Sequence, residues 1–164
     1  MHNLTIKRVS QVVFAIVVCE LAGIAGSVFT VSSVSSWYVT LLKPALNPPS
    51  WVFGPVWTLL YLLMGISVFL VWENKSEITA MDRKRGLILF FVQLVLNMLW
   101  SIFFFGLHNP TLALYDIVAL WIAILATMVS FYKISRTAMY LLLPYILWVS
   151  FAVYLNYSIV ALNI

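Results

Sequence analysis

The segment WVFGPVWTLLYLLMGISVFLVW, residues 51–72, decides the fold class of this chain because it contains no charged side chain. A helix needs about 20 apolar residues to cross a bilayer core about 30 Å thick. Four further windows of this kind lie at about residues 9–31, 86–107, 111–132 and 138–162. The sequence therefore predicts an all-α integral membrane bundle of five transmembrane helices, built as one domain from residues 1–164.

The composition excludes an ordinary soluble domain. Of the 164 residues, 64% are hydrophobic and 9% are charged, whereas soluble domains average about 45–50% apolar and about 25% charged residues. Eight of the nine Lys and Arg residues fall near the N-terminus or in the loops after the second and fourth helices, and only Lys43 falls on the other side. The cytoplasmic loops of membrane proteins carry an excess of Lys and Arg over the loops on the other side. We therefore expect a multi-pass protein of the cell membrane with a cytoplasmic N-terminus, an outer C-terminus and no nucleic-acid partner.

The first apolar window has an alternative as a cleaved signal peptide, because Lys7 and Arg8 precede it and residues 22–25 are small. The apolar core of a signal peptide runs for about 7–15 residues, whereas this run continues to Val31. We favour a retained helix. Its Cys19 is the single cysteine of the chain, so no internal disulfide is possible.

The connection between the first two helices, residues 32–50, is long and contains three prolines together with Trp37 and Tyr38. Proline fixes φ and removes a backbone donor, so this loop is predicted to hold one extended shape. A rigid aromatic loop above a helix bundle suggests a lid on a binding site. The alternative is an interfacial loop whose Trp and Tyr side chains lie among the lipid headgroups.

Three predicted helices each carry a tryptophan on a stripe of residues spaced by three or four positions, which places each stripe on one helix face. The stripes are Trp57–Tyr61–Met64, Gln93–Asn97–Trp100 and Trp148–Ala152–Leu155. If they converge, they line a cavity of flat aromatic surface with a few hydrogen-bonding groups, which suits a large, planar, apolar ligand. The alternative for Gln93 and Asn97 is that their side chains serve only to hydrogen-bond one helix to another.

Two carboxylates lie within the predicted helices, and such groups normally face the protein interior or a wet cavity. Asp116, near the outer start of the fourth helix, either lines a site or complements the helix dipole. Glu20 has no basic partner in the membrane, so we expect it to be protonated or hydrogen-bonded to another helix. The small residues Ala22, Gly23 and Gly26 favour close helix packing, with a homodimer interface as the alternative.

Several kinds of chemistry have no residues to perform them. The sequence has no Cys/His cluster for a metal, no Gly-rich phosphate loop and no Ser-His-Asp set. His2 is terminal and His108 lies in a predicted turn, so neither suits a buried haem ligand. We therefore expect no metal site and no required cofactor, and a tetrapyrrole ligand would be a metal-free ring.

Three motifs resemble the TspO/translocator protein family, the tryptophan-rich sensory proteins or peripheral-type benzodiazepine receptors. They are Trp37-Tyr38-x-x-Leu41-x-Lys43-Pro44-x-x-x-Pro48-Pro49 with Pro55-Val56-Trp57-x-x-Leu60-Tyr61, then Gln93-Leu94-x-Leu96-Asn97-x-x-Trp100-x-x-x-Phe104-Phe105-Gly106, and Pro144-Tyr145-x-x-Trp148-x-x-Phe151-Ala152-x-x-Leu155-Asn156. The resemblance spans nearly the whole chain. It implies a five-helix membrane bundle, often dimeric, that binds porphyrins such as protoporphyrin IX and in some bacterial members promotes their light- and oxygen-dependent breakdown.

The resemblance also implies which residues bind the ligand. Carried over motif by motif, they are Ser27, Trp37, Phe53, Trp57, Asn97, Trp100, Asp116, Trp148, Ala152 and Leu155. If breakdown occurs, its chemistry belongs to the excited porphyrin, and Trp57 and Trp148 are predicted as the oxidisable, catalytic groups beside it. The cholesterol motif of animal members needs a basic residue soon after the fifth-helix Tyr. Tyr157 is followed by Ser-Ile-Val-Ala-Leu, which indicates a bacterial member.

The sequence thus predicts a membrane protein that binds porphyrins and senses them or promotes their light-dependent degradation. One alternative is a transporter of tetrapyrroles or other apolar metabolites. Transporters usually show internal repeats and broken helices, and this chain offers only Pro144 as a break. The other alternative is a non-catalytic sensory or scaffold protein that a partner reads through the charged loop of residues 75–85.

Overall fold

The computed structural model describes residues 2–74 and 80–163, and the side chains from residue 6 onward within those ranges. Residues 75–79 of the charged loop therefore lie outside the described residues. The long helices are α1 (His2–Val34), α2 (Phe53–Glu73), α3 (Ala80–Ser101), α4 (Pro110–Tyr132) and α6 (Leu143–Leu162), with the short helix α5 (Arg136–Leu141) before α6. Two 3₁₀ turns, η1 (Tyr38–Thr40) and η2 (Ser50–Val52), lie in the first loop, and a π-helical segment, η4 (Ile102–Gly106), continues α3.

The predicted membrane bundle is confirmed. Within residues 2–74 and 80–163 there is no strand, and five helical segments are long and apolar enough to cross a bilayer. They are Ile6–Val34, Ser50–Glu73, Ala80–Gly106, Pro110–Tyr132 and Arg136–Leu162. The first of them exposes a row of large apolar side chains, including Phe14, Val17 and Leu21, as a helix in contact with lipid requires.

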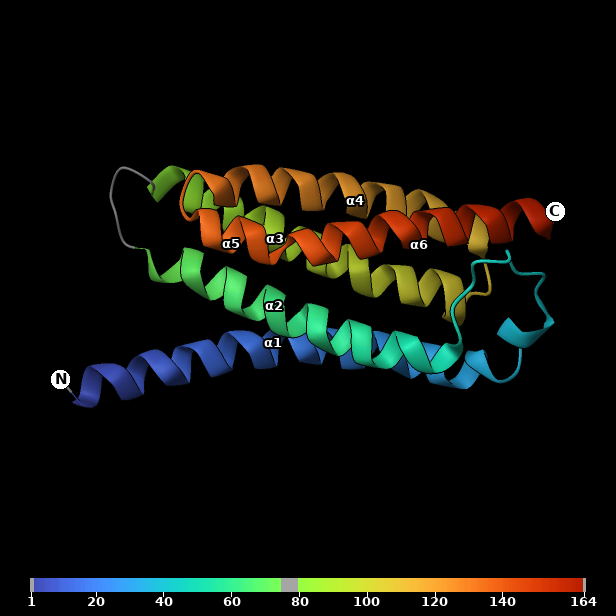
Figure 1. Ribbon diagram of the computed structural model, residues 1–164, viewed down its shortest axis with the longest axis horizontal. Helices are drawn as coiled ribbons and strands as arrows, with labels where there is room; N and C mark the ends of the chain where they lie inside the picture. Colours follow the sequence, from blue (N-terminus) through green and yellow to red (C-terminus); the bar gives the residue numbers. More distant parts are fainter. Residues whose placement is uncertain (1, 75–79, 164) are drawn as a thin grey trace.

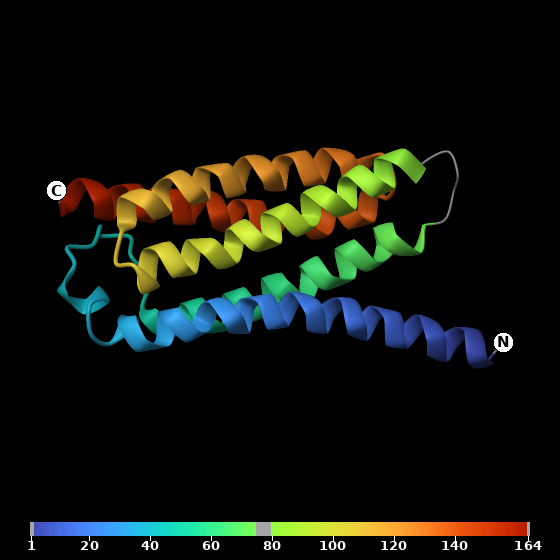
Figure 2. The ribbon, with the colours of Figure 1, turned by 180° about the vertical axis from the view of Figure 1, so that it is seen from behind.

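The helices run lengthwise beside one another, with α1 and α2 on one side, α4 and α6 on the other, and α3 between them (Figures 1 and 2). The N-terminus, α5 and the start of α3 lie at one end of the bundle, whereas the first loop and the C-terminus lie at the other. Ion pairs at the N-terminal end join Arg8 to Glu73 at 2.8 Å and Lys133 to Asp82 at 3.6 Å. Which side of the membrane this end faces stays a prediction.

Local sequence signals set several helix ends. The Asn109 side chain accepts a hydrogen bond from the Leu112 N–H at 2.9 Å, and Pro110 follows it at the first helical position of α4. Proline is well placed there because its missing N–H would have no partner inside the helix. Pro144 has the same role in the first turn of α6. The predicted fifth helix is therefore split into α5 and α6 at Leu142, two residues before that proline.

The contact between α1 and α2 depends on a glycine. A Cβ atom at Gly65 would lie 2.5 Å from the Ile16 Cα, so only glycine lets the two backbones approach this closely. The α2 helix is also joined to α5, where the buried Ser67 hydroxyl donates to the Ala138 carbonyl at 2.7 Å. These contacts fix the C-terminal half of α2. The cavity described below lies along its N-terminal half.

Candidate ligand-binding site

A cavity of about 510 Å³ extends from the first loop toward the middle of the bundle, between α1, α2, α3 and α6. Its volume falls within the range of about 300–1,000 Å³ that is usual for small-molecule sites. The lining residues are Glu20, Gly23, Ile24, Ser27, Thr30, Val31, Val34, Ser35, Tyr38, Ser50, Phe53, Gly54, Trp57, Thr58, Tyr61, Asn97, Trp100, Ser101, Phe104, Phe105, Ala152, Leu155, Asn156 and Ile159.

The structure brings seven of the ten predicted ligand-binding residues to this cavity. Those that line it are Ser27, Phe53, Trp57, Asn97, Trp100, Ala152 and Leu155. The other three, Trp37, Asp116 and Trp148, are not among its lining residues. Ligand contact by any of these side chains stays a prediction.

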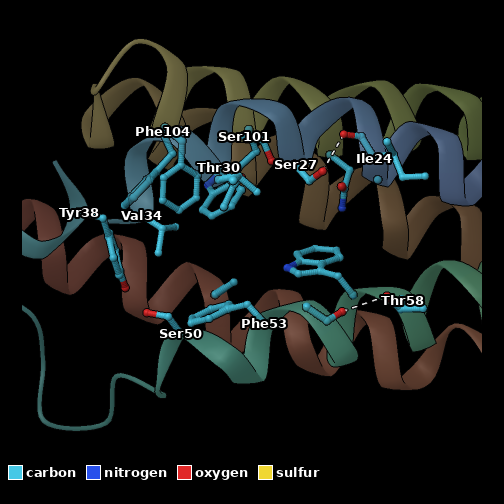
Figure 3. A pocket seen from close by; sticks show the side chains of 18 of the residues that line it. Ile24, Ser27, Thr30, Val34, Tyr38, Ser50, Phe53, Thr58, Ser101 and Phe104 are labelled. Atoms are coloured by element: carbon cyan, nitrogen blue, oxygen red, sulfur yellow. Dashed lines mark hydrogen bonds between the residues drawn. The ribbon is translucent and has the colours of Figure 1, made fainter. Parts of the chain in front are cut away.

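One wall of the cavity is a single stripe of α1, with lining residues at positions 20, 23, 24, 27, 30, 31 and 34. Figure 3 shows Ile24 and Ser27 of this stripe facing Phe53 and Thr58 of α2 across the hollow. The stripe includes a glycine because a Cβ atom at Gly23 would lie 2.3 Å from the Tyr61 ring. The small residues of the first helix therefore serve packing inside the bundle at this point.

A chain of hydrogen bonds fixes the polar inner end of the cavity. The Tyr61 hydroxyl donates to the Asn97 side-chain carbonyl. The Asn97 amide donates to the Tyr145 hydroxyl at 2.9 Å, and that hydroxyl donates to Gln93 Oε1 at 2.8 Å. Both amides therefore take part in hydrogen bonds between helices, and Asn97 also lines the cavity.

The π-helical segment η4 shapes the wall beyond Trp100. Its wider turn, closed by a hydrogen bond from the Leu107 N–H to the Ile102 carbonyl at 2.8 Å, lets the consecutive residues Phe104 and Phe105 both be buried and both line the cavity. The Trp100 ring stacks on Phe104 with 5.2 Å between centroids. An ordinary α-helix directs adjacent side chains to different faces, so this aromatic wall could not be read from helical spacing.

The indole N–H of Trp100 is already used within the protein. It donates to Asn156 Oδ1 at 3.0 Å, and the Asn156 amide donates in turn to the Pro110 carbonyl at 2.8 Å. These bonds tie α3, α6 and the start of α4 together. Trp100 consequently offers a ligand its ring and not its N–H group.

All three predicted stripes reach the cavity, but only two of them bring their tryptophan to it. Trp57 lines the cavity with its ring 5.6 Å from that of Tyr61. Trp148 instead packs edge-on against the cavity-lining ring of Phe53, with 5.9 Å between centroids, and is not itself among the lining residues. The third stripe reaches the cavity only one turn further along α6, through Ala152 and Leu155.

Trp37 and Asp116 are not among the residues that line the cavity. Trp37 stacks on His108 with 4.5 Å between centroids and an interplanar angle of 24°, and it meets Phe104 edge-on. It therefore fastens the first loop to the turn between η4 and α4. Asp116 is buried on α4 beyond its first turn, and its Oδ2 has no hydrogen-bond partner among the described residues. Because Asp116 lies beyond the first turn of α4, its position does not support the interpretation that it complements the helix dipole.

The first loop covers the outer end of the cavity through Tyr38, which is one of the lining residues (Figure 3). The Tyr38 hydroxyl donates to Asn47 Oδ1 at 2.8 Å, and Lys43 Nζ lies 4.7 Å from the centre of its ring. Burial raises the pKa of the Tyr38 phenol above its ordinary value, so the hydroxyl stays a donor. The loop is also hydrogen-bonded to Asn163, the residue that follows α6. The Asn163 side chain accepts from the Leu42 N–H at 3.0 Å and donates to the Leu42 carbonyl at 2.9 Å.

Comparison with known proteins places this bundle in a family. The sequence model of the TspO/MBR family matches residues 15–162. The chain is 45% identical over 161 residues to the tryptophan-rich protein TspO of Chlorobaculum tepidum, covering 96% of this chain and 98% of that protein. It is 46% identical to the tryptophan-rich protein TspO of Archaeoglobus fulgidus (95% and 99% covered) and 39% identical to the translocator protein of Homo sapiens (85% and 82% covered). The chain belongs to the TspO/MBR family, as the motif resemblance predicts, and is a multi-pass membrane protein.

Some lining residues were not predicted to bind a ligand. The sequence predicts Glu20 only as an intramembrane carboxylate without a basic partner, because its position at the cavity depends on the rotation of α1. Spacing from Ser27 offered a usable signal, because residues 20, 23, 24 and 27 follow the repeat of one helix face. For Phe105 no such signal exists, since the π-turn that directs it inward has no recognisable sequence pattern.

Proposed function

We propose that the protein binds a planar, metal-free tetrapyrrole such as protoporphyrin IX in this cavity, and that it senses the ligand or promotes its light-dependent degradation. The observation that carries the proposal is the lining itself. Trp57 and Trp100 come from different helices, and Phe53 and Phe104 extend the aromatic surface on either side. Stacking between rings adds to the gain from burying apolar area, so such a lining favours a large flat ligand.

Asn97 is the group best placed to orient the polar edge of the ring. Its carbonyl accepts from Tyr61 and one of its amide hydrogens goes to Tyr145. An amide side chain has two donor hydrogens and two acceptor lone pairs. One hydrogen and one lone pair therefore remain for a ligand, held in a fixed direction by the two tyrosines.

If the bound porphyrin is degraded in light, the reactive state is that of the ring itself, and the protein supplies position and an oxidisable neighbour. Trp57 is the member of the predicted pair that lines the cavity, whereas Trp148 contacts Phe53 and is not among the lining residues. We therefore expect the two indoles to contribute unequally, with Trp57 the more important.

The test is a titration of purified protein with protoporphyrin IX, followed by tryptophan fluorescence in the dark and then by porphyrin absorbance under illumination. Trp57→Phe keeps an aromatic face and should bind within about threefold of the wild type, because most of the stacked area remains, but it should lose most of the breakdown. Trp148→Phe is the matched control and should retain more breakdown. Equal loss of binding and breakdown in Trp57→Phe would mean that the indole serves packing alone. Saturable binding without bleaching would remove the degradation claim and leave the binding claim.

A further inference from the structure

Glu20 lies at the inner end of the cavity, away from the first loop. It is the innermost member of the α1 stripe that lines the cavity, as Tyr61 is on α2 and Asn97 on α3. It also lies at the middle of the membrane-crossing segment Ile6–Val34. A carboxyl group is thus placed at mid-bilayer depth and inside a ligand-sized space.

Within the part of the chain that the structure describes, the Glu20 carboxyl group has no hydrogen-bonding or ionic partner. Among the described residues that line the cavity, none is a Lys, Arg or His. The hydroxyl of Tyr61, which lines the same end of the cavity, donates to Asn97. Carboxylates at this depth are costly and normally face a partner or a wet cavity, and here the cavity is what Glu20 faces.

The surroundings of Glu20 are those of a cation site. The Tyr61 ring lies at the same end of the cavity, and the Trp57 ring is one turn away with 5.6 Å between the two centroids. The faces of Trp and Tyr rings attract cations, and more strongly where water is excluded. A positive charge close to a carboxyl group also favours its ionised form. An apolar channel that ends in two aromatic rings and one carboxylate matches a ligand with an apolar body and a positive end.

We propose that the inner end of the cavity binds lipophilic cations, in which a protonated or quaternary nitrogen lies against Glu20 and the Trp57 and Tyr61 rings. The apolar body of the ligand extends outward along Ile24 and Phe53. This ligand class is additional to the tetrapyrroles proposed above, which bring no permanent positive charge. The two classes share one cavity and therefore compete for it.

A matched pair of probes isolates the charge. N-methylacridinium and acridine have the same ring system, and only the first is permanently charged. The wild-type protein in detergent should bind N-methylacridinium about tenfold more tightly than acridine, as a desolvated cation–aromatic site with an added carboxylate predicts. Glu20→Gln should reduce this preference to about twofold or less, since Gln keeps nearly the shape of Glu and only the charge is removed.

Two control variants accompany this measurement. Glu20→Asp keeps the charge and should keep a preference for the cation. Glu73→Gln removes a carboxylate that pairs with Arg8 on the surface, away from the cavity, and should leave the preference unchanged. A preference that persists in Glu20→Gln, or a wild type that does not distinguish the two probes, overturns the proposal.

A second measurement needs no variant and so does not depend on the folding of Glu20→Gln. Dicyclohexylcarbodiimide reacts with carboxyl groups in apolar surroundings, and the modified residue is identified by mass spectrometry. N-methylacridinium should protect Glu20 from this reagent, whereas acridine at equal occupancy should protect it less. Equal protection by both probes overturns the proposal. Neither experiment involves a porphyrin, so failure here leaves the tetrapyrrole proposal to its own titration.

Discussion

Asn163 should control how firmly the first loop closes the cavity. Its side chain accepts from the Leu42 N–H at 3.0 Å and donates to the Leu42 carbonyl at 2.9 Å. A third bond, to the Ile159 carbonyl at 2.8 Å, holds the same side chain against α6. Asn163→Ala removes both bonds to the loop. At about 1 kcal/mol each, the loss is about 2 kcal/mol, or about thirtyfold in the equilibrium between attached and detached loop.

Amide hydrogen exchange measures this equilibrium directly, because the Leu42 N–H exchanges only when its bond to Asn163 is broken. In Asn163→Ala, the Leu42 amide, followed in a peptide that covers residues 38–46, should exchange about thirtyfold faster. Ser158→Ala is the matched control, since the Ser158 hydroxyl bonds only to the Tyr154 carbonyl within α6. Exchange in Asn163→Ala that stays within about twofold of the wild type would show that the loop is held by its other contacts and that the reasoning is wrong.

Two further substitutions test the packing around the site. Gly65→Ala should lower the melting temperature in detergent, because its Cβ would lie 2.5 Å from the Ile16 Cα. Overpacking of this kind costs about 1–3 kcal/mol. Gly54→Ala is the control and should leave the melting temperature unchanged, since no atom lies within 4 Å of the added Cβ. Tyr145→Phe should also lower the melting temperature, by the equivalent of about 1–3 kcal/mol, because the buried amides of Gln93 and Asn97 each lose a partner. It should also weaken porphyrin binding, since Asn97 is then held by Tyr61 alone. A Tyr145→Phe protein with unchanged stability and affinity would contradict the role given to the hydrogen-bond chain.

The sequence was sufficient for the fold because a membrane imposes a strong length and composition rule on each helix. It was also sufficient for most of the cavity wall. Helical spacing places Trp57 and Tyr61 on one face of α2, and Asn97 and Trp100 on one face of α3, and the structure turns both faces to the same space.

The positions that differ from expectation depend on contacts that spacing does not encode. Trp148 shares a helix face with Ala152, but it packs against the Phe53 ring from another helix and does not line the cavity. Trp37 lies in the loop over the site, yet its ring stacks on His108. In both cases the neighbour comes from a distant part of the chain, so its position was known only once the helices were assembled.

Filling the cavity that Trp57 and Trp100 line is the most direct test of whether a planar ligand binds there. Ala152 lines the cavity, whereas Ala161, on the same helix, is exposed. Protoporphyrin IX titrated in the dark should bind Ala152→Phe at least about tenfold more weakly than the wild type, since the added ring takes the volume the ligand needs, and Ala161→Phe should bind normally. Equal affinity for all three proteins would place the porphyrin elsewhere and contradict the account.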